Sequence, residues 1–348
     1  MLKIAILGAG SMGTAFSVPC SDNGHQINII GTHLEDKFIE NIRNNSNYHP
    51  SLGVSVSSKI NFCKNHEINS VLIQNLNLIV LAVTSKGIEW AANELSKIYK
   101  NKKIPSIVLL TKGLSLHENS YEILVDKLSR LLNEQNVKGV NISAIGGPCL
   151  AKGLANKIHT SVVLANKDIQ HVKELSKIFS TDYYHISHSN DIIGVEVCAA
   201  IKNIYSMAIG ASNGLCSETA DEKIRLNNYL NTSASLVNQS IQEMQFFVNF
   251  LKGKKETVMG LAGVGDLYVS ADGGRNSKMG TYLGQGLTYK EAKESKMSKI
   301  TVEGAELIFE IGKKILSNSS VKELPLMIAI IDSVLNNKKL TINWKNFK

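Results

Sequence analysis

The N-terminal stretch "MLKIAILGAGSMGTAF", residues 1–16, decides the fold of this 348-residue chain. Its aliphatic run "IAIL" is typical of a strand buried on both faces. The run leads directly into Gly8, Gly10 and Gly13, a G-x-G-x-x-G pattern that opens a helical segment. Such glycines permit a tight turn, a close approach of backbone to a pyrophosphate, and close packing of helix on strand. In this strand–turn–helix context the pattern predicts a dinucleotide-binding fingerprint.

The alternation of strands and helices continues downstream of the fingerprint. Segments 77–87, 105–114 and 141–155 each pattern as a buried strand followed by a small polar turn, and segments 88–99 and 120–133 pattern as helices. This alternation predicts a parallel, doubly wound sheet. From about residue 191 the pattern is helical. We therefore expect an α/β, Rossmann-like dinucleotide-binding domain at 1–188 and an all-α domain, which binds and converts the substrate, at 189–348.

Composition narrows the class of protein. The chain is 43% hydrophobic and 20% charged, with a formal net charge of +8, which is typical of a soluble globular protein. Its Lys and Arg residues are scattered and form no basic block, which favours an anionic small substrate over nucleic acid. The five cysteines include no C-x-x-C pair and indicate reduced thiols in the cytoplasm. We expect neither a metal site nor a membrane span, because no His and carboxylate cluster has ligand spacing and no apolar run approaches about 20 residues.

The end of the second strand normally selects the cofactor. An Asp or Glu there binds the ribose 2′-hydroxyl of NAD, whereas a nearby Arg accommodates the 2′-phosphate of NADP. This chain has Gly31, Thr32 and His33 at that place, with Glu35 and Asp36 slightly later. The choice between NAD and NADP stays open at this point.

A lysine stands out in the apolar helix predicted over residues 192–211. Glu196, Lys202, Asn203 and Ser206 are its strongly polar interior residues, and at about 100° per residue they fall within a sector of roughly 120°. Desolvation lowers the pKa of a lysine, so Lys202 could donate a proton near neutral pH. The alternatives are a lysine that extends to the surface or one that pairs with Glu196.

The stretch "LAGVGDLYVSADGGRNSK", residues 261–278, offers partners for this lysine and for an anion. Asp266 could orient a lysine ammonium without a metal. Arg275 beside two glycines combines a guanidinium fork with exposed backbone N–H groups, which suits a phosphate dianion. Lys112 follows a predicted strand at the end that faces a nicotinamide, although a lysine in such a turn is more often solvated.

Together these motifs resemble the NAD(P)-dependent glycerol-3-phosphate dehydrogenases of the soluble, two-domain type. The resemblance covers essentially the whole chain. It rests on "GAGSMGTAF", "TKGLS", "GGPCLAKGLA", "GVEVCAAIKNIYSMAIGASNGL", "GLAGVGDLYVSADGGRNSKMG" and "VEGAELI". The "EVCAAIKN" and "GDL…GGRN" motifs are the specific part, because other dehydrogenases share only the first motif.

The resemblance implies roles for individual residues. It implies catalysis by Lys202, Lys112 and Asp266. It implies substrate contacts by Lys112, Asn203, Ser270, Arg275, Asn276 and Gly147. It implies cofactor contacts by Gly8, Gly10, Ser11, Met12, Gly13, Thr32, His33, Lys112, Ala151, Arg275 and Glu303.

The implied reaction is reversible hydride transfer from NAD(P)H to C2 of dihydroxyacetone phosphate in a water-poor cleft between the domains. It would give sn-glycerol 3-phosphate for phospholipid synthesis, in a cytoplasmic homodimer. Two alternatives remain. One is a related reductase of another phosphorylated ketose or of a keto acid, as in opine dehydrogenases, and the other is a non-catalytic dinucleotide sensor. The "GGRN" motif argues against a keto acid, and Lys112 and Lys202 argue against a sensor.

Overall fold

The computed structural model describes residues 1–216, 222–318 and 322–347, with the backbone alone over 222–228. Its contacts divide the chain into two compact units. One comprises Met1–Lys112 and Ile123–Ile192, and the other comprises Gly113–Glu122 and Ile193–Lys348. The hairpin between residues 113 and 122 thus groups with the helical part of the chain. The domain boundary that we place at residues 188 and 189 stays a prediction.

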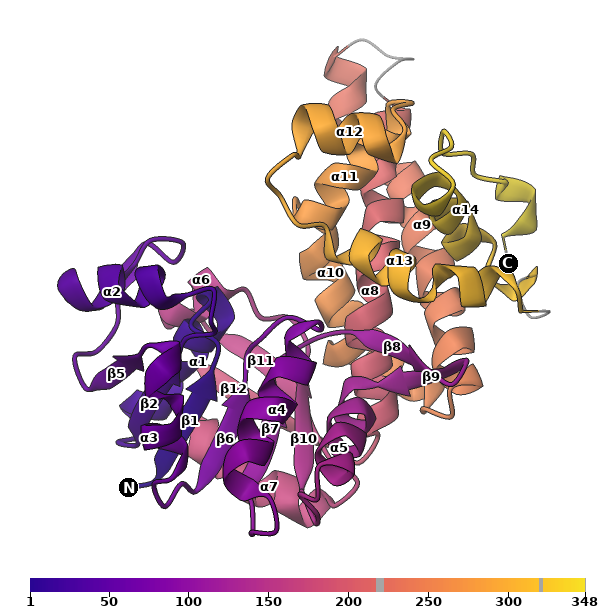
Figure 1. Ribbon diagram of the computed structural model, residues 1–348. Helices are drawn as coiled ribbons and strands as arrows, with labels where there is room; N and C mark the ends of the chain where they lie inside the picture. The colour runs from indigo at the N-terminus through magenta and orange to yellow at the C-terminus, as the bar shows by residue number, and fades with distance from the viewer. Residues whose placement is uncertain (217–221, 319–321, 348) are drawn as a thin grey trace. The chain divides into compact units, whose positions relative to one another are not determined.

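An eight-stranded sheet forms the centre of the first unit, in the order β12-β11-β10-β7-β6-β1-β2-β5 (Figure 1). The strands are β1 (Lys3–Leu7), β2 (Gln26–Ile30), β5 (Ile60–Cys63), β6 (Leu78–Leu81), β7 (Ser106–Leu109), β10 (Ile142–Gly146), β11 (Thr160–Ala165) and β12 (Tyr184–Ser189). All pairs from β5 to β10 are parallel, which confirms the Rossmann-like sheet.

The last two strands differ from the fully parallel sheet that the sequence predicts. β11 pairs with β10 in antiparallel fashion, and β12 runs parallel to β11. The connection from β10 to β11 holds only the five-residue helix α6 (Ala151–Ala155). A helix of that length spans about 7 Å, less than the roughly 17 Å of a five-residue strand, so it does not return the chain along the sheet.

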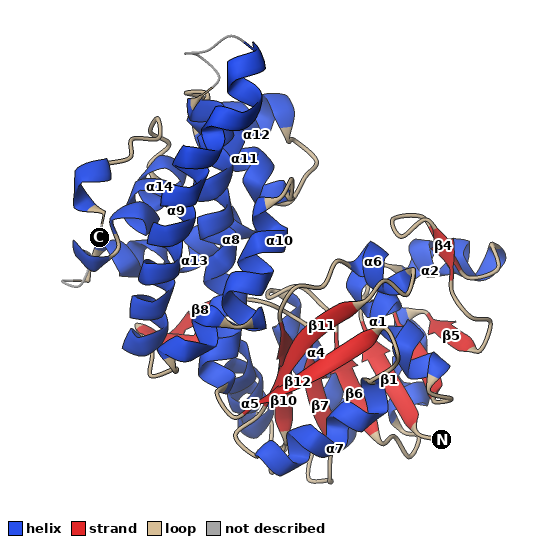
Figure 2. Ribbon diagram, turned by 180° about the vertical axis from the view of Figure 1, so that it is seen from behind, coloured by secondary structure: helices blue, strands red, loops and turns tan. Residues whose placement is uncertain are grey.

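Helices cover both faces of this sheet (Figures 1 and 2). One face carries α1 (Ser11–Asp22), α6 and α7 (Ile169–Phe179), and the other carries α3 (Ile68–Leu72), α4 (Gly87–Tyr99) and α5 (Leu124–Glu134). Beside β2 and β5 lie α2 (Asp36–Asn44), the hairpin of β3 (Tyr48–His49) and β4 (Val54–Ser55), and the short turn η1 (Asn65–Glu67). Burial on both faces explains why β1 and β6 are continuous aliphatic runs.

Apart from the hairpin of β8 (Leu114–His117) and β9 (Ser120–Ile123), the second unit is helical. Segment 120–133, which the sequence predicts as one helix, is therefore β9 followed by α5. The helices are α8 (Ile192–Leu215), α9 (Glu222–Phe250), η2 (Lys255–Met259), η3 (Leu261–Gly265), α10 (Asp266–Ala271), α11 (Arg275–Gly284), α12 (Tyr289–Lys296), α13 (Glu303–Leu316), α14 (Pro325–Leu335) and η5 (Trp344–Asn346).

Helix α8 is the core helix of this unit. By length and composition alone its 24 residues could cross a membrane, so the expectation that no apolar run approaches that length was wrong. However, 94% of its most apolar window is buried inside the protein. In both views α8 lies between α9 on one side and α10 and α11 on the other (Figures 1 and 2). Its apolar surface is therefore satisfied by packing within the unit.

Helices α8 and α11 touch through their backbones. A Cβ atom on Gly210 would lie 2.1 Å from the carbonyl oxygen of Ser277, and one on Gly280 would lie 1.9 Å from that of Met207. Only glycine at these two positions permits so close an approach. The contact brings the polar residues of α8 next to those at the start of α11.

A buried carboxylate joins α9 to the start of α14. Glu243 accepts hydrogen bonds from the backbone N–H groups of Leu326 (2.7 Å) and Met327 (2.8 Å). It also accepts from Gln239 Nε2 (2.9 Å) and the Tyr205 hydroxyl (3.2 Å). Burial raises the pKa of Glu243 to about 7, although these hydrogen bonds oppose the shift.

This raised pKa predicts a dependence of stability on pH. Because the folded-state pKa lies above the ordinary value of 4.5, the group destabilises the fold progressively as pH rises from about 4.5 to about 7. A shift of this size corresponds to about 3 kcal/mol. Glu243→Gln removes the ionisation, so we expect a flatter pH dependence of the apparent urea midpoint, followed by circular dichroism from pH 5 to 8.

The matched control is Glu310→Gln, which removes an exposed carboxylate from α13 of the same unit. We expect this variant to keep the pH dependence of the parent protein. An unchanged pH dependence in Glu243→Gln would show that Glu243 does not carry the effect.

Candidate active site

The glycines of the fingerprint loop allow a close packing of the backbone that side chains would prevent. Gly8 has φ +109°, and a Cβ atom there would lie 2.6 Å from the Ala82 carbonyl oxygen. A Cβ atom on Gly13 would lie 2.2 Å from the carbonyl oxygen of Gly8. Helix α1 begins at Ser11, directly after Gly10, so the N–H groups of its first turn lack partners within the helix. This arrangement fits the pyrophosphate of NAD or NADP, and Ser11 and Met12 would contribute first-turn donors.

The loop after β2 contains a carboxylate that bonds back to the fingerprint. Glu35 Oε2 accepts from the backbone N–H of Thr32 at 2.7 Å and from that of Ala9 at 3.3 Å. His33 is exposed, and its ring centroid lies 6.4 Å from that of Trp90 on α4. The sequence places Thr32 and His33 at this loop but does not single out Glu35 as a neighbour of the fingerprint. The sequence signal that could have found Glu35 is its position as an acidic residue shortly after the second strand, displaced from the usual place at the end of that strand.

Lys112 lies near the carboxyl end of β7, next to the carboxyl end of its parallel neighbour β10. Its Nζ donates a hydrogen bond to the carbonyl oxygen of Gly147 at 3.2 Å. Gly147 has φ +115°, a backbone conformation that favours glycine, and Ala151 follows as the first residue of α6. Lys112 and Gly147 thus meet at the end of the sheet where such folds bind ligands, and Ala151 follows four residues after Gly147.

In the second unit, Lys202 forms a buried ion pair. Its Nζ lies 2.9 Å from Asp266 Oδ1 and also donates to the Ser270 hydroxyl. Lys202 is 7% exposed and Asp266 is 2% exposed. A charged ammonium at this depth requires such compensation, because burying either charge alone costs several kcal/mol. The sequence leaves Lys202 either extending to the surface or pairing with Glu196. The structure shows an internal ion pair, but its carboxylate partner is Asp266 and not Glu196.

The backbone places Asp266 at a change of helix type. The preceding segment η3 is a π-helical turn, and α10 begins at Asp266 itself. Such π turns are rare and recur at functional sites. Ser270 lies four residues further along α10, on the same face, so both side chains reach Lys202.

Asn203 and Asn276 connect α8, α11 and α13. The Asn276 side-chain amide donates to Asn203 Oδ1 at 3.0 Å, and its oxygen accepts from the backbone N–H of Gly304 at 2.8 Å. Arg275, the first residue of α11, pairs with Glu303, the first residue of α13. Both side chains of that pair are substantially exposed, so the guanidinium remains accessible to an anion.

The predicted site residues therefore lie in both units, and in the first unit they belong to two sets of contacts, one at the fingerprint and Thr32 and one at Lys112 and Gly147. Within residues 1–216, 222–318 and 322–347, no three His, Cys, Asp or Glu side chains come together as metal ligands. The chemistry available in the second unit is a buried ammonium with two polar partners, beside an accessible guanidinium. These groups can donate a proton and bind an anion.

Comparison with known proteins gives the same picture over the whole chain. The family model for the N-terminus of NAD-dependent glycerol-3-phosphate dehydrogenase matches residues 3–172, and the model for its C-terminus matches residues 191–344. The NADP(+)-dependent glycerol-3-phosphate dehydrogenase of Archaeoglobus fulgidus is 31% identical, with 99% of each chain covered. The glycerol-3-phosphate dehydrogenase [NAD(P)+] of Francisella philomiragia is 29% identical over 94% of this chain and 91% of its own length.

A solved structure is similar along the same length. The glycerol-3-phosphate dehydrogenase of Coxiella burnetii superimposes with a TM-score of 0.78 at 25% identity, covering 97% of this chain and 96% of the other. Sequence, fold and the two family models agree. The chain belongs to the NAD-dependent glycerol-3-phosphate dehydrogenase family.

Proposed function

We propose that this protein catalyses the reversible, NAD(P)H-dependent reduction of dihydroxyacetone phosphate to sn-glycerol 3-phosphate. The observation that carries the proposal is the Lys202 ammonium, buried against Asp266 and Ser270 in a chain whose two halves match this family. The relatives' names include both an NADP(+)-dependent and an NAD(P)+ enzyme, which supports NAD or NADP as the cofactor.

Proton transfer is the step that we assign to Lys202. When bound, the dinucleotide supplies a hydride to the substrate carbonyl carbon. Lys202 donates a proton from Nζ to the alkoxide that develops on the carbonyl oxygen, and its charge stabilises that oxygen before the transfer. Asp266 is 2.9 Å from Nζ and holds the ammonium in position without a metal. Ser270 hydrogen-bonds the same nitrogen, and we assign it to the substrate as a further contact.

The substrate phosphate is the group that we assign to Arg275 and Asn276. The guanidinium is accessible and offers a bidentate fork to a dianion. Asn203 and Asn276 share a hydrogen bond, which holds both amides for contact with the substrate. We assign Glu303 and Arg275 to the cofactor side as well. From the first unit we propose Lys112 and Gly147 as substrate contacts, and Lys112, Ala151, Thr32 and His33 as cofactor contacts.

The wider role that we propose is the supply of glycerol phosphate for phospholipid synthesis, by a homodimer in the cytoplasm. The product carries the glycerol backbone that phospholipids require. The two rival functions are less well supported. An arginine combined with exposed backbone N–H groups suits a phosphate dianion better than the single carboxylate of a keto acid, and a dinucleotide sensor does not need a buried, compensated proton donor.

Replacing Lys202 tests the proton-donor role. Lys202→Met keeps the length of the side chain but removes the ammonium, so we expect kcat to fall about 1,000-fold. NADH binding, measured by fluorescence titration, should stay within about twofold of the parent, because the fingerprint is intact.

The single variant leaves the buried Asp266 carboxylate without its ammonium, which destabilises the fold. The double variant Lys202→Met, Asp266→Asn removes both charges and serves as the folded control, verified by thermal melting. Turnover within tenfold of the parent in either variant would contradict the role of Lys202 as the proton donor.

Replacing Arg275 tests recognition of the phosphate. We expect Arg275→Ala to lower kcat/KM for dihydroxyacetone phosphate by roughly 10- to 100-fold, mainly through KM, since a charge-assisted hydrogen bond is lost. With unphosphorylated dihydroxyacetone, at saturating cofactor, the loss should be less than about threefold.

The matched control is Lys290→Ala, which removes an exposed cation from α12 of the same unit. It changes the net charge equally and should leave kcat/KM for both substrates unchanged. Equal losses with the two substrates in Arg275→Ala would contradict the phosphate role.

A further inference from the structure

The loop between β2 and α2 bears on the choice between NAD and NADP that the sequence leaves open. Residues 32–35 form a turn closed by a backbone hydrogen bond from the Glu35 N–H to the Thr32 carbonyl oxygen at 2.9 Å. The Glu35 side chain folds back over this turn and accepts from Thr32 N–H at 2.7 Å. The same oxygen accepts from Ala9 N–H at 3.3 Å, inside the fingerprint. A carboxylate thus spans the end of β2 and the glycine loop.

The second carboxylate oxygen lies toward Gly10. A Cβ atom placed on Gly10 would lie 4.0 Å from Glu35 Oε1. In a Rossmann-type fold this corner, between the fingerprint and the end of β2, receives the adenosine ribose. Glu35 therefore occupies the place of the acid that usually ends the second strand, although it stands five residues beyond the end of that strand.

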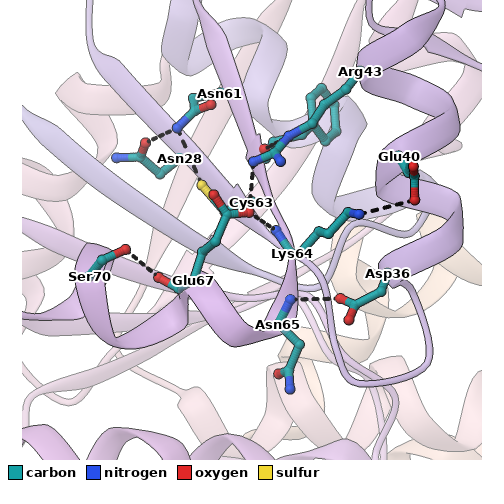
Figure 3. A network of polar contacts seen from close by, with 11 residues as sticks. Asn28, Asp36, Glu40, Arg43, Asn61, Cys63, Lys64, Asn65, Glu67 and Ser70 are labelled. Carbon is teal, nitrogen blue, oxygen red and sulfur yellow. Dashed lines mark hydrogen bonds and ion pairs between the residues drawn. The ribbon is translucent and has the colours of Figure 1, made fainter.

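The start of α2 is fixed on two sides, which holds Glu35 in place. Asp36 Oδ1 accepts from the backbone N–H of Asn65 at 2.7 Å, so the first residue of α2 is tied to the segment after β5 (Figure 3). The ring of Phe38 packs edge-on against His49, with centroids 5.0 Å apart. His49 is buried, and burial lowers its pKa below the ordinary 6.5. Its ring is thus neutral near pH 7 and does not offset the charge of Glu35.

Two of the nearby cations, Arg43 and Lys64, are paired with other carboxylates. Arg43 donates to Glu67 at 2.8 Å and to the Phe62 carbonyl oxygen at 2.5 Å. Lys64 pairs with Glu40 at 3.0 Å, as Figure 3 shows. Two further basic residues flank the turn: the exposed Lys37 on α2, and His33, whose ring lies beside Trp90.

We infer that Glu35 binds the hydroxyl groups of the adenosine ribose and makes this enzyme selective for NADH over NADPH. A carboxylate accepts hydrogen bonds from a ribose diol, whereas it repels the 2′-phosphate of NADPH. The inference deepens the proposed function, on which it rests for the presence of a dinucleotide site. It requires no step of the reaction, so binding alone tests it.

The test measures binding of NADH and of NADPH separately, by fluorescence titration in the absence of substrate. For the parent protein at low ionic strength we expect Kd for NADPH to exceed Kd for NADH by about tenfold or more. Added salt should reduce this ratio, because it screens the repulsion between the 2′-phosphate and a partly exposed carboxylate. Equal Kd values, or tighter binding of NADPH, would overturn the inference and indicate that Lys37 or His33 binds the 2′-phosphate of NADPH.

The variant Glu35→Gln isolates the charge. Glutamine retains an oxygen that can accept from the N–H of Thr32, so the turn is kept. We expect tighter NADPH binding, weaker NADH binding and a ratio of Kd values near one. The matched control is Asp36→Asn, which removes the same charge one residue away and keeps an acceptor for the Asn65 N–H. It should leave the ratio within about twofold of the parent. An unchanged ratio in Glu35→Gln, or an equal change in Asp36→Asn, would overturn the assignment.

These outcomes separate the inference from the proposed function. Selective NADH binding without reduction of dihydroxyacetone phosphate would contradict the proposed substrate and leave the role of Glu35 standing. Reduction of dihydroxyacetone phosphate at equal efficiency with both cofactors, together with equal Kd values, would support the proposed function and overturn the role of Glu35.

Discussion

The ion pair between Lys202 and Asp266 is the interaction on which the second unit depends. An ammonium inside the apolar core helix α8 is stable only if a carboxylate and a further acceptor reach it. Asp266 and Ser270 supply these contacts from one short helix that follows a π-helical turn. The lysine that this pair stabilises is also the proton donor that we propose, so the stability of the core and the proposed chemistry share one group.

Backbone contact between helices arranges the residues around this pair. The glycines of α8 and α11 bring the two helices together, which sets Asn203 beside Asn276. Asn276 in turn bonds the N–H of Gly304 at the start of α13, and Arg275 meets Glu303 across the same two helix starts. A larger residue at either glycine would push the helices apart and separate the groups assigned to the phosphate from those assigned to the proton.

Local patterns account for what the sequence predicts well. The fingerprint, the aliphatic strands and the motif around Arg275 depend on residues close together in the chain, so their geometry follows from spacing alone. The apolar helix that carries Lys202 was likewise evident, since one polar sector interrupts an apolar surface. These features are enough to predict the fold class and to single out the fingerprint, Lys202 and Arg275, whereas the resemblance to the family supplied most of the other site residues.

Features that depend on distant partners were not predictable in this way. Glu243 caps α14 from a position 83 residues earlier in the chain, and no local pattern marks that pairing. The antiparallel direction of β11 results from the shortness of helix α6, which does not return the chain along the sheet. Strand β9 occupies the first residues of segment 120–133, although the whole segment has helical periodicity. Glu35 stands too late in the sequence to be the usual acid of β2, and only the folded turn brings its carboxylate to the fingerprint.

The most direct measurement follows the absorbance of the reduced nicotinamide while the purified protein is given dihydroxyacetone phosphate, with unphosphorylated dihydroxyacetone as the control. The account predicts rapid oxidation of the cofactor that depends on the phosphate, with sn-glycerol 3-phosphate as the product. Failure to oxidise either NADH or NADPH, by a protein that still binds them, would contradict it.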